Sequence, residues 1–202
     1  RIEAAARSLN REELFHEVAR TREAISVDYK AWRIASQDRD VLDIQTGVDI
    51  NAILSNAIWV VTLSDIAPDQ IKEDVATDLP KCSCDPIVIG ELVNELLLNA
   101  CKYRYEGTKV TLSARVEKST VHISVINEID SKEADTVKNE LVRVYEPFFR
   151  GSNRRHISGT GLGLWRVACL MDAHPRGKRK IQCKHLGDEF YIVSSIWVPI
   201  SA

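Results

Sequence analysis

Residues 144–165 read VYEPFFRGSNRRHISGTGLGLW and combine an aromatic turn, a basic run and a glycine-rich segment. Gly159, Gly161 and Gly163 come just before an apolar pattern with helical spacing. Glycines in this position let the backbone approach a ligand closely, and the free N–H groups of a first helical turn attract anions. The stretch predicts an anion-binding loop, and the plainer alternative is a hinge loop followed by a glycine-capped helix.

A second motif, NELLLNACKYR, occupies residues 94–104 of a predicted helix. Glu95 and Asn99 are four residues apart, so their side chains lie on the same face of that helix. A carboxylate beside an amide oxygen can hold a magnesium ion and orient a nucleophile. Lys102 and Tyr103 add a cation that can reach phosphate and a flat ring. An ordinary helix with a polar outer stripe remains the alternative.

The composition of the chain changes near Pro68. The sequence before it is rich in Ala, Glu and Arg and contains one glycine, which is typical of long helices. After it, strand patterns such as 109–117 and 120–126 alternate with helical patterns, and a closing hairpin is predicted around Gly187. Elements of this kind predict an α+β chain whose residues 68–202 form a two-layer α/β sandwich.

The sequence before Pro68 predicts a helical hairpin. Apolar side chains recur at coiled-coil spacing over residues 14–32, and residues 36–38 offer N-capping side chains for a second helix over residues 41–58. Two helices alone have a thin core, so we expect residues 1–67 to pair with a second copy as a dimeric four-helix bundle.

Composition argues against several classes of function. A net charge of −2 over 202 residues with 28% charged side chains does not favour a general nucleic-acid binder. The sequence lacks the ~18 consecutive apolar residues of a membrane span, and its start does not read as a signal peptide. We expect a cytoplasmic chain, compatible with the cytosolic part of a larger sensor. The scattered cysteines, including the Cys82-Ser83-Cys84 run, predict reduced thiols rather than zinc.

In combination, the motifs resemble the GHKL ATPases, a superfamily that includes gyrase, the heat-shock chaperone of ninety kilodaltons, histidine kinases and MutL. NELLLNACKY, YEPFFRG and GTGLGL follow one another as the N, F and G2 boxes of that superfamily do. The wording of these boxes looks like a sensor histidine kinase, and the resemblance covers residues 85–200. It implies a Bergerat-type sandwich that binds Mg-ATP, autophosphorylates a histidine and passes the phosphoryl group to the receiver domain of a response regulator in two-component signal transduction.

The resemblance also implies which residues meet the nucleotide. Asn99, with Glu95 beside it, would bind Mg²⁺. Lys102 and Arg150 would meet phosphate oxygens, and Tyr103 would line the nucleotide pocket.

A mobile lid over about residues 130–158 is implied as well, with Phe148 and Phe149 as its anchors. The G2 segment would wrap the phosphates at the start of the following helix. Its implied cofactor-binding residues are Gly159, Thr160, Gly161, Leu162 and Gly163.

The first departure from the family lies in the G1 box, where D-x-G-x-G is expected after a strand. This chain reads Asn127-Glu128-Ile129-Asp130 there, so the acceptor for the adenine amino group is Asn127 and the glycines are missing. An amide oxygen can still accept that hydrogen bond. The loss of the glycines stiffens the turn and predicts a weaker affinity for nucleotide.

The phosphoacceptor motif is the second departure. Residues 15–24 read FHEVARTREA, with an extra residue before Arg-Thr and no proline after it. His16 lies away from the apolar seam, and an exposed imidazole followed by Glu17 suits in-line attack on a phosphate. An ordinary exposed histidine in a charged helix is the open alternative.

Glu95 is the third departure, because many histidine kinases carry Asn at this position. E-x-x-x-N is the pattern of the ATP-hydrolysing and serine-kinase branches, in which the Glu is a general base. A second function therefore stays open: a nucleotide-binding module that hydrolyses ATP slowly, phosphorylates a protein serine, or acts as a pseudokinase scaffold.

Overall fold

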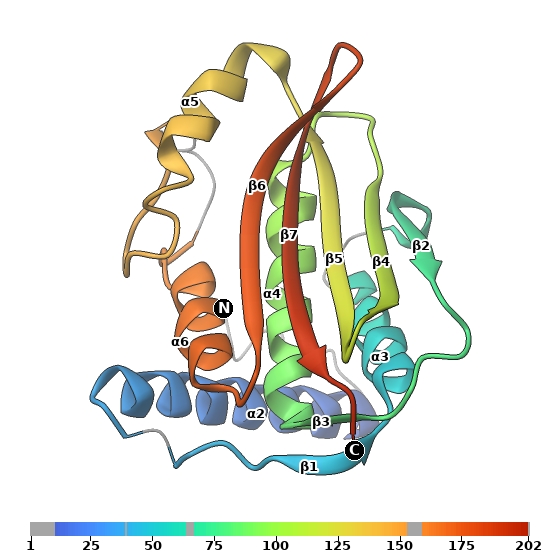
Figure 1. Ribbon diagram of the computed structural model, residues 1–202, viewed down its shortest axis with the longest axis vertical. Coiled ribbons are helices and arrows are strands. Elements are labelled where there is room, and N and C mark those ends of the chain that lie inside the picture. Colours follow the sequence, from blue (N-terminus) through green and yellow to red (C-terminus); the bar gives the residue numbers. More distant parts are fainter. Residues whose placement is uncertain (1–10, 39, 64–66, 153–158, 202) are drawn as a thin grey trace.

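A computed structural model of the chain describes residues 11–38, 40–63, 67–152 and 159–201, with the backbone alone described for residues 11–20. Figure 1 shows an α+β sandwich in which one sheet lies over a layer of helices. In chain order, the main elements are α2 (Arg11–Ala35), β1 (Gln45–Val48), α3 (Ile50–Thr62), β2 (Ile71–Val75), β3 (Cys82–Cys84), α4 (Pro86–Tyr103), β4 (Val110–Glu117), β5 (Thr120–Ile129), α5 (Ala134–Glu140), α6 (Gly163–Ala173), β6 (Lys178–Leu186) and β7 (Glu189–Pro199).

Five strands form the large sheet, in the order β2-β4-β5-β7-β6. β2 runs parallel to β4, and the other neighbouring pairs are antiparallel. Ala114, Ile123 and Ile196 lie side by side on β4, β5 and β7, and all three are fully buried on the face that meets the helices. The strand pair predicted over residues 109–126 and the closing hairpin around Gly187 are confirmed.

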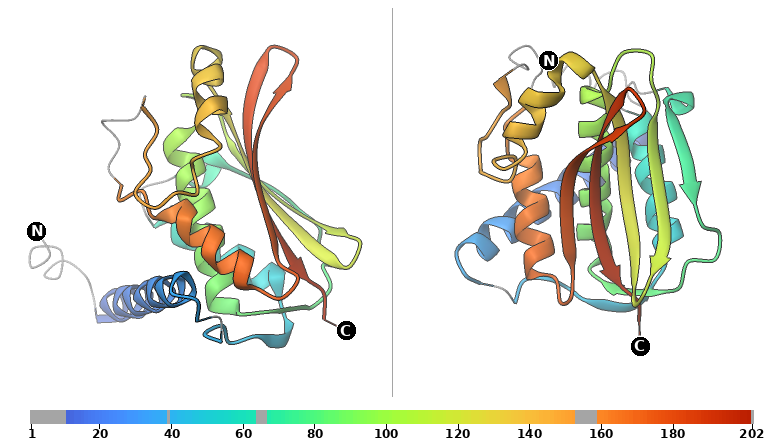
Figure 2. Two further views of the ribbon diagram at one scale, coloured as in Figure 1. Left: turned by 60° about the vertical axis from the view of Figure 1, so that its left-hand side comes forward. Right: turned by 45° about the horizontal axis from the view of Figure 1, so that its top comes forward.

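Helix α4 lies behind the centre of the sheet, with α3 and α6 on either side of it (Figures 1 and 2). Its start is fixed by Asp85, whose Oδ1 accepts a hydrogen bond from the backbone N–H of Val88 at 3.1 Å, and by Pro86 in the first turn. The buried face of this helix includes Ile89, Leu92, Val93, Leu96, Leu97 and Ala100, whereas Ile87 in the first turn is exposed.

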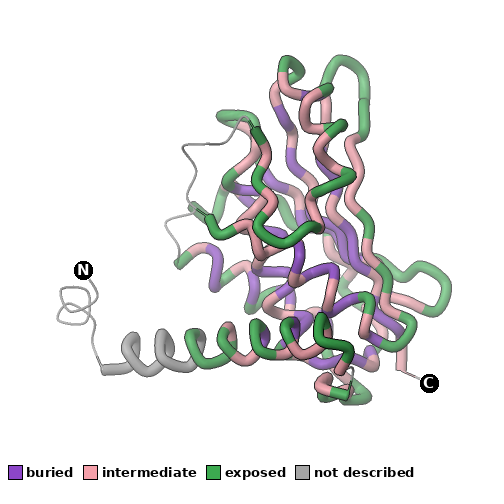
Figure 3. Tube along the Cα trace, turned by 90° about the vertical axis from the view of Figure 1, so that its left-hand side faces the viewer, coloured by how far each residue is buried: buried purple, intermediate pink, exposed green. Residues whose placement is uncertain are grey.

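One apolar core joins α2, α3, α4, α6 and the inner face of the sheet. In Figure 3 the buried residues, in purple, concentrate between the sheet and these helices. A smaller apolar cluster around Ile129 and Ile192 packs against α5 at the other end of the sheet. The space between these two clusters is where the candidate site lies.

The predicted second helix of a hairpin, starting near residue 38, is wrong for residues 41–48. Residues 45–48 instead form strand β1, which pairs antiparallel with β3. Gly47 adopts a φ of +75°, a left-handed conformation that interrupts a helix. The helix begins only after Asp49, whose side chain caps it by accepting from the N–H of Ala52.

Helix α3 packs against α4 and contributes Leu54, Ala57 and Val61 to the core of the sandwich. The predicted hairpin is therefore not seen, because the apolar face of this helix is covered by α4 instead of by α2. The division of the chain between residues 67 and 68 and the dimeric bundle stay predictions.

Helix α2 is docked by its C-terminal half across the end of the sandwich (Figure 1). Val27 and Ala31 are buried in the core, and Lys30 Nζ lies 2.5 Å from Oδ2 of buried Asp85. The ring centre of Trp32 lies 4.6 Å from the ring centre of Trp165 on α6. Within the described ranges, no helix is long and apolar enough to cross a lipid bilayer.

Candidate functional site

A cavity of about 380 Å³ lies between α4, the inner face of the sheet, the segment after β5 and the start of α6. Its size is within the range of small-molecule and cofactor sites. Ten of the residues predicted for the site line it: Glu95, Asn99, Lys102, Tyr103, Asn127, Arg150, Gly159, Thr160, Gly161 and Gly163. The predicted residues of four separated segments thus surround the same cavity.

Three predicted residues are not among those that line the cavity. Leu162 packs its side chain against the apolar core. His16 and Glu17 lie in helix α2, and their side chains are outside the described part of the structure. Their predicted roles stay predictions.

The amide of Asn99 is oriented by Glu95. Nδ2 of Asn99 donates a hydrogen bond to Oε1 of Glu95 at 2.9 Å. A carboxylate accepts only, so the amide must turn its NH₂ group toward Glu95 and its oxygen away from it. This leaves Oδ1 of Asn99 for another group, and an amide oxygen is a suitable ligand for Mg²⁺. Residues at this end of the cavity therefore fit a magnesium ion.

Metal binding here would need oxygen atoms from a ligand as well. Among the residues that the structure describes, no group of three His, Cys, Asp or Glu side chains could hold a metal ion. Magnesium is usually bound by one or two protein side chains together with substrate phosphates. A single amide oxygen beside a carboxylate fits that mode of binding.

Arg166, which the sequence analysis missed, forms an ion pair with Glu95 inside the site. Its Nη2 lies 2.5 Å from Oε2 of Glu95, and its Nη1 lies 2.7 Å from Oδ1 of Asp28 on helix α2. Burial lowers the pKa of Arg166, but the charges of Glu95 and Asp28 outweigh burial and raise that pKa overall. Both oxygens of Glu95 are thus engaged, one by Asn99 and one by Arg166.

Gly163 makes room for Glu95 at the start of helix α6. A Cβ atom at Gly163 would overlap the carboxylate of Glu95. The absence of a side chain at the third glycine of the motif therefore leaves the space that the Glu95 carboxylate occupies. The phosphate-wrapping role of this glycine stays a prediction.

Gly161 has a different reason to be glycine. It adopts a φ of +74°, and a Cβ there would lie 2.8 Å from the carbonyl oxygen of Phe149. The aromatic turn and the glycine-rich segment therefore meet backbone to backbone. Phe149 lines the cavity, whereas Phe148 is 62% exposed, and its predicted role as an anchor of the lid stays a prediction. The backbone of Phe148, with a φ of +63°, makes the contact with Gly161 instead.

The side-chain amide of Asn127 is oriented by two backbone carbonyl groups. Nδ2 donates to the carbonyl oxygens of Tyr103 at 3.4 Å and Glu128 at 3.3 Å. Two carbonyls on one side of the amide require its donor end there, so the oxygen is turned the other way. The residue is buried and lines the cavity. Its Oδ1 is therefore suited to accept a hydrogen bond from an amino group, and the predicted contact with adenine stays a prediction.

The missing G1 glycines change the end of strand β5. The strand continues to Ile129, three residues beyond its predicted end, and Ile129 pairs with Phe190 of β7. Asp130 then caps a short 3-10 turn by accepting from the N–H of Lys132. Without glycines, the segment keeps extended backbone geometry and remains in the sheet.

The other end of the cavity is apolar, and the sequence analysis did not find it. Its walls come from strands β5, β6 and β7 and from helix α5, with the side chains of Ile129, Val137, Leu141, Ile181 and Ile192. These residues lie far apart in the sequence, and only the register of the strands brings them together. An apolar slot of this kind suits the faces of a flat ring.

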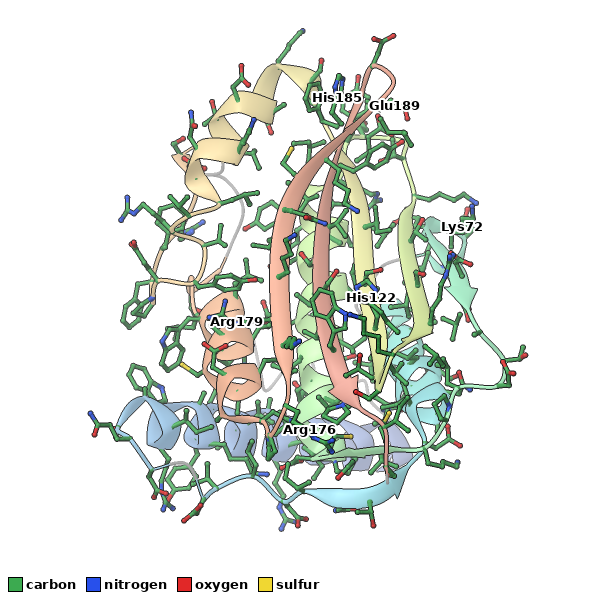
Figure 4. All side chains as sticks on the ribbon, viewed as in Figure 1. Lys72, His122, Arg176, Arg179, His185 and Glu189 are labelled. Carbon is green, nitrogen blue, oxygen red and sulfur yellow. The ribbon has the colours of Figure 1, made fainter. Side chains whose placement is uncertain are left out.

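The segment predicted as a lid is tied down at two places. Oε1 of Glu140 on α5 accepts from the N–H of Ser152 at 2.8 Å and from its hydroxyl at 2.6 Å. The guanidinium of Arg179, labelled in Figure 4, lies 4.0 Å from the ring centre of Tyr145 and 2.7 Å from a carboxylate oxygen of Asp172. The first contact holds Ser152 to α5, which is itself part of the segment, and the second joins Tyr145 to Arg179 at the start of β6. Arg179 is in turn paired with Asp172 on α6.

Comparisons with known proteins agree with this geometry. Residues 84–198 match the family model described as Histidine kinase-, DNA gyrase B-, and HSP90-like ATPase. Sensor histidine kinase HprS of Escherichia coli (strain K12) is 30% identical over 90 residues, which is 45% of this chain and 19% of that protein. The chain spans about a fifth of the length of the first curated relatives that it matches.

Solved structures with the same fold include the mycobacterial sensor histidine kinase MprB. It has a TM-score of 0.58 at 18% identity and covers 79% of this chain and 99% of that one. ShkA, full-length and in complex with AMPPNP, has a TM-score of 0.61 at 19% identity, over 96% of this chain and 41% of that one. The match to the family model covers more than half of the sequence and contains α4, the F turn and the glycine-rich segment, so the chain belongs to the family of histidine kinase-, DNA gyrase B- and HSP90-like ATPases.

Proposed function

We propose that this chain is the ATP-binding part of a sensor histidine kinase, a protein kinase of two-component signal transduction. The observation that carries the proposal is the orientation of Asn99 and Asn127 in one cavity. Each amide has its NH₂ group fixed by a protein acceptor, so each offers an oxygen to a ligand. ATP with magnesium supplies a metal ion and an amino group, the partners that such oxygens accept.

The adenine would occupy the apolar end of the cavity. Asn127 Oδ1 would accept a hydrogen bond from the amino group, and Ile181 and Ile192, on neighbouring strands, would contact the ring from the side of the sheet. Tyr103 adds an aromatic wall. ShkA has been solved with AMPPNP, an analogue of ATP, which supports the choice of ligand.

The triphosphate would lie toward Asn99 and the glycine-rich segment. When bound, Mg²⁺ neutralises charge on the phosphate oxygens. Asn99 would hold that ion through Oδ1, and Lys102 and Arg150, which line the same cavity, would bind phosphate oxygens. The backbone around Gly161, which lines the cavity, would face the phosphates. These groups would position the γ-phosphate and stabilise the charge that develops on it.

The phosphoryl acceptor in this proposal is His16, with Glu17 orienting its ring and keeping the attacking nitrogen unprotonated. Transfer breaks the bond between the γ-phosphorus and the bridging oxygen of ADP and forms a bond from phosphorus to the imidazole nitrogen. An aspartate of a response regulator receiver domain would then take the phosphoryl group. We further propose that the chain works in the cytoplasm, as part of a larger sensor.

A homodimer through helix α2 belongs to the same proposal. Ile25, Tyr29 and Trp32 recur at helical spacing, and each is about half exposed or more on the docked helix. This apolar stripe continues the coiled-coil pattern that begins at Leu14 in the sequence. A second copy of the helix, with the same stripe, would cover it.

The test is incubation of the chain with γ-labelled ATP and Mg²⁺, followed by acid and base treatment of the product. We expect label that acid removes and base does not, which is the behaviour of phosphohistidine. His16→Gln should abolish labelling while ATP affinity stays unchanged. Acid-stable label, or normal labelling of His16→Gln, contradicts the proposal.

The alternative, with Glu95 as a general base for hydrolysis or serine transfer, has less support. In the structure the carboxylate of Glu95 accepts from Asn99 and pairs with Arg166. A general base needs an oxygen that faces the attacking group, whereas both oxygens of Glu95 are engaged by protein donors. If hydrolysis or serine transfer is nevertheless found and Glu95→Ala abolishes it, the alternative takes the place of the kinase proposal.

A further inference from the structure

We propose that Arg166 is a positioning residue that links the docking of helix α2 to the magnesium ligand Asn99. The link runs through Glu95 on one side of the guanidinium and Asp28 on the other. This inference rests on the proposed binding of Mg-ATP in the cavity, and it concerns how that binding is regulated.

The contacts form an unbroken chain across three helices. Asp28 Oδ1 on α2 lies 2.7 Å from Nη1 of Arg166 on α6, and Nη2 of Arg166 lies 2.5 Å from Oε2 of Glu95 on α4. Oε1 of Glu95 then accepts from Asn99 at 2.9 Å. Each contact uses a different atom, so Arg166 and Glu95 each hold two partners at the same time.

The position of Glu95 is fixed from two sides. Because Gly163 has no Cβ, the carboxylate of Glu95 fits against the first turn of α6, where Arg166 meets it. The side chains of Glu95 and Arg166 are 20% and 19% exposed, so water screens their attraction less than it screens a surface pair. Glu95 therefore has one preferred position, and from it the carboxylate orients the amide of Asn99.

Arg166 supports Asn99 without touching the ion that Asn99 would hold. Groups that orient a metal ligand through a hydrogen bond are known to affect metal affinity strongly. Without the guanidinium, the carboxylate of Glu95 is free to rotate away from Asn99. The amide of Asn99 then loses the partner that turns its oxygen toward the ion.

Asp28 adds a contribution that depends on helix α2. Val27, Ala31 and the pair of Lys30 with Asp85 hold the helix in place independently of Asp28. Asp28 therefore reaches Arg166 only when the helix is docked. Its side chain is 52% exposed, so we expect its effect on Arg166 to be smaller than that of Glu95. Undocking of α2 would thus weaken the support of Asn99.

The experiment measures the dissociation constant of ATP with Mg²⁺ and with chelator present, by calorimetry, for the wild-type chain and four variants. Arg166→Met keeps the length of the side chain and removes its charge. It should reduce the gain in affinity that Mg²⁺ provides by about tenfold and leave the affinity for metal-free ATP unchanged. Asp28→Asn should reduce the same gain, by less.

The double variant Asp28→Asn/Arg166→Met should behave as Arg166→Met alone, since Asp28 acts through Arg166. Arg115→Met, which removes a surface ion pair with Asp74, is the matched control and should leave both affinities unchanged. The near-ultraviolet circular dichroism of the Trp32–Trp165 pair reports whether α2 stays docked, and we expect Asp28→Asn to retain it.

Equal losses with and without Mg²⁺ in Arg166→Met overturn the proposal, because they indicate a general structural role. A further loss from Asp28→Asn in the Arg166→Met background overturns the link through Arg166. These outcomes differ from failure of the proposed function: a wild-type chain that binds Mg-ATP but never forms phosphohistidine contradicts the kinase proposal, and the binding data still decide the role of Arg166.

Discussion

Gly161 lies against the backbone of Phe148, so that a Cβ atom on Gly161 would stand 2.7 Å from the carbonyl carbon of Phe148. Both residues have positive φ angles, of +74° and +63°. The aromatic turn and the glycine-rich segment can therefore pack this closely only because residue 161 has no side chain.

Gly161→Ala should disturb this contact and the cavity next to it. We expect a loss of about 1–3 kcal/mol in the free energy of unfolding, from the left-handed backbone and the overlap with Phe148 and Phe149, and a weaker affinity for ATP. Denaturant unfolding and calorimetry measure the two effects. Gly90→Ala in helix α4, where a Cβ would make only an ordinary contact, is the control and should be neutral or stabilising.

Asn99→Ala and Asn127→Ala should separate the two ends of the cavity. Without Asn99, the gain in ATP affinity from Mg²⁺ should largely disappear, while the affinity for metal-free ATP is kept. Without Asn127, affinity should fall about fivefold with or without Mg²⁺, which is the worth of one hydrogen bond. If the two variants respond to Mg²⁺ in the same way, the assignment of the two ends is wrong.

Stability should depend on pH through two histidines. Burial lowers the pKa of His174 despite the nearby Pro175 carbonyl and Asp85, and it also lowers the pKa of His122, which stacks on Trp197. The unfolded chain therefore binds more protons than the folded chain below about pH 6.5, so the free energy of unfolding should fall as the pH decreases through that value. His174→Leu should reduce this slope in denaturant titrations at several pH values. An unchanged slope would mean that His174 does not contribute to it.

Dimerisation should depend on the exposed stripe of helix α2. Tyr29→Glu places a charge in the middle of the stripe, and light scattering should then show a monomer where the wild-type chain shows a dimer. Leu186→Glu, on an exposed apolar residue of the β6–β7 hairpin, serves as the control and should stay dimeric. A Tyr29→Glu variant that remains a dimer places the interface elsewhere.

The stacking of Arg179 on Tyr145 should restrain the segment before the glycines. Arg179→Met removes a cation–π contact worth about 0.5–2 kcal/mol and the ion pair with Asp172. Amide hydrogen exchange should become faster over residues 143–149 and stay unchanged in β4. Unchanged exchange over residues 143–149 would indicate that Glu140 and Ser152 hold the segment alone.

Local patterns in the sequence were enough to predict the sandwich. The alternation along β4 and β5 and the apolar period of α4 fix these elements wherever they pack, and the capping Asp85 marks the start of the helix. The spacing of Glu95 and Asn99 placed both on one face, as the structure has them.

Partner choice, in contrast, could not be predicted. The apolar residues of α3 predict that one face of this helix is buried. Their pattern does not indicate whether α4 or α2 packs against that face. Arg166 stands in an apolar helical pattern, and its pairing with Glu95, 71 residues away, depends on the packing of α6 beside α4. The contact of Arg166 with Asp28 joins residues 138 positions apart in the sequence, so it depends on tertiary packing in the same way.

The small sheet of β1 and β3 has a mechanical consequence. Strand β1 follows helix α2 after a short connection, and Gly47 at its turn donates to the Ser201 hydroxyl, while the N–H of Ser201 bonds to the carbonyl of Lys81. Ser201, near the end of the described chain, is therefore hydrogen-bonded to strand β1, which follows α2. Along the chain, a displacement of α2 therefore meets the β1–β3 pair and its bonds to Ser201 before it reaches α3.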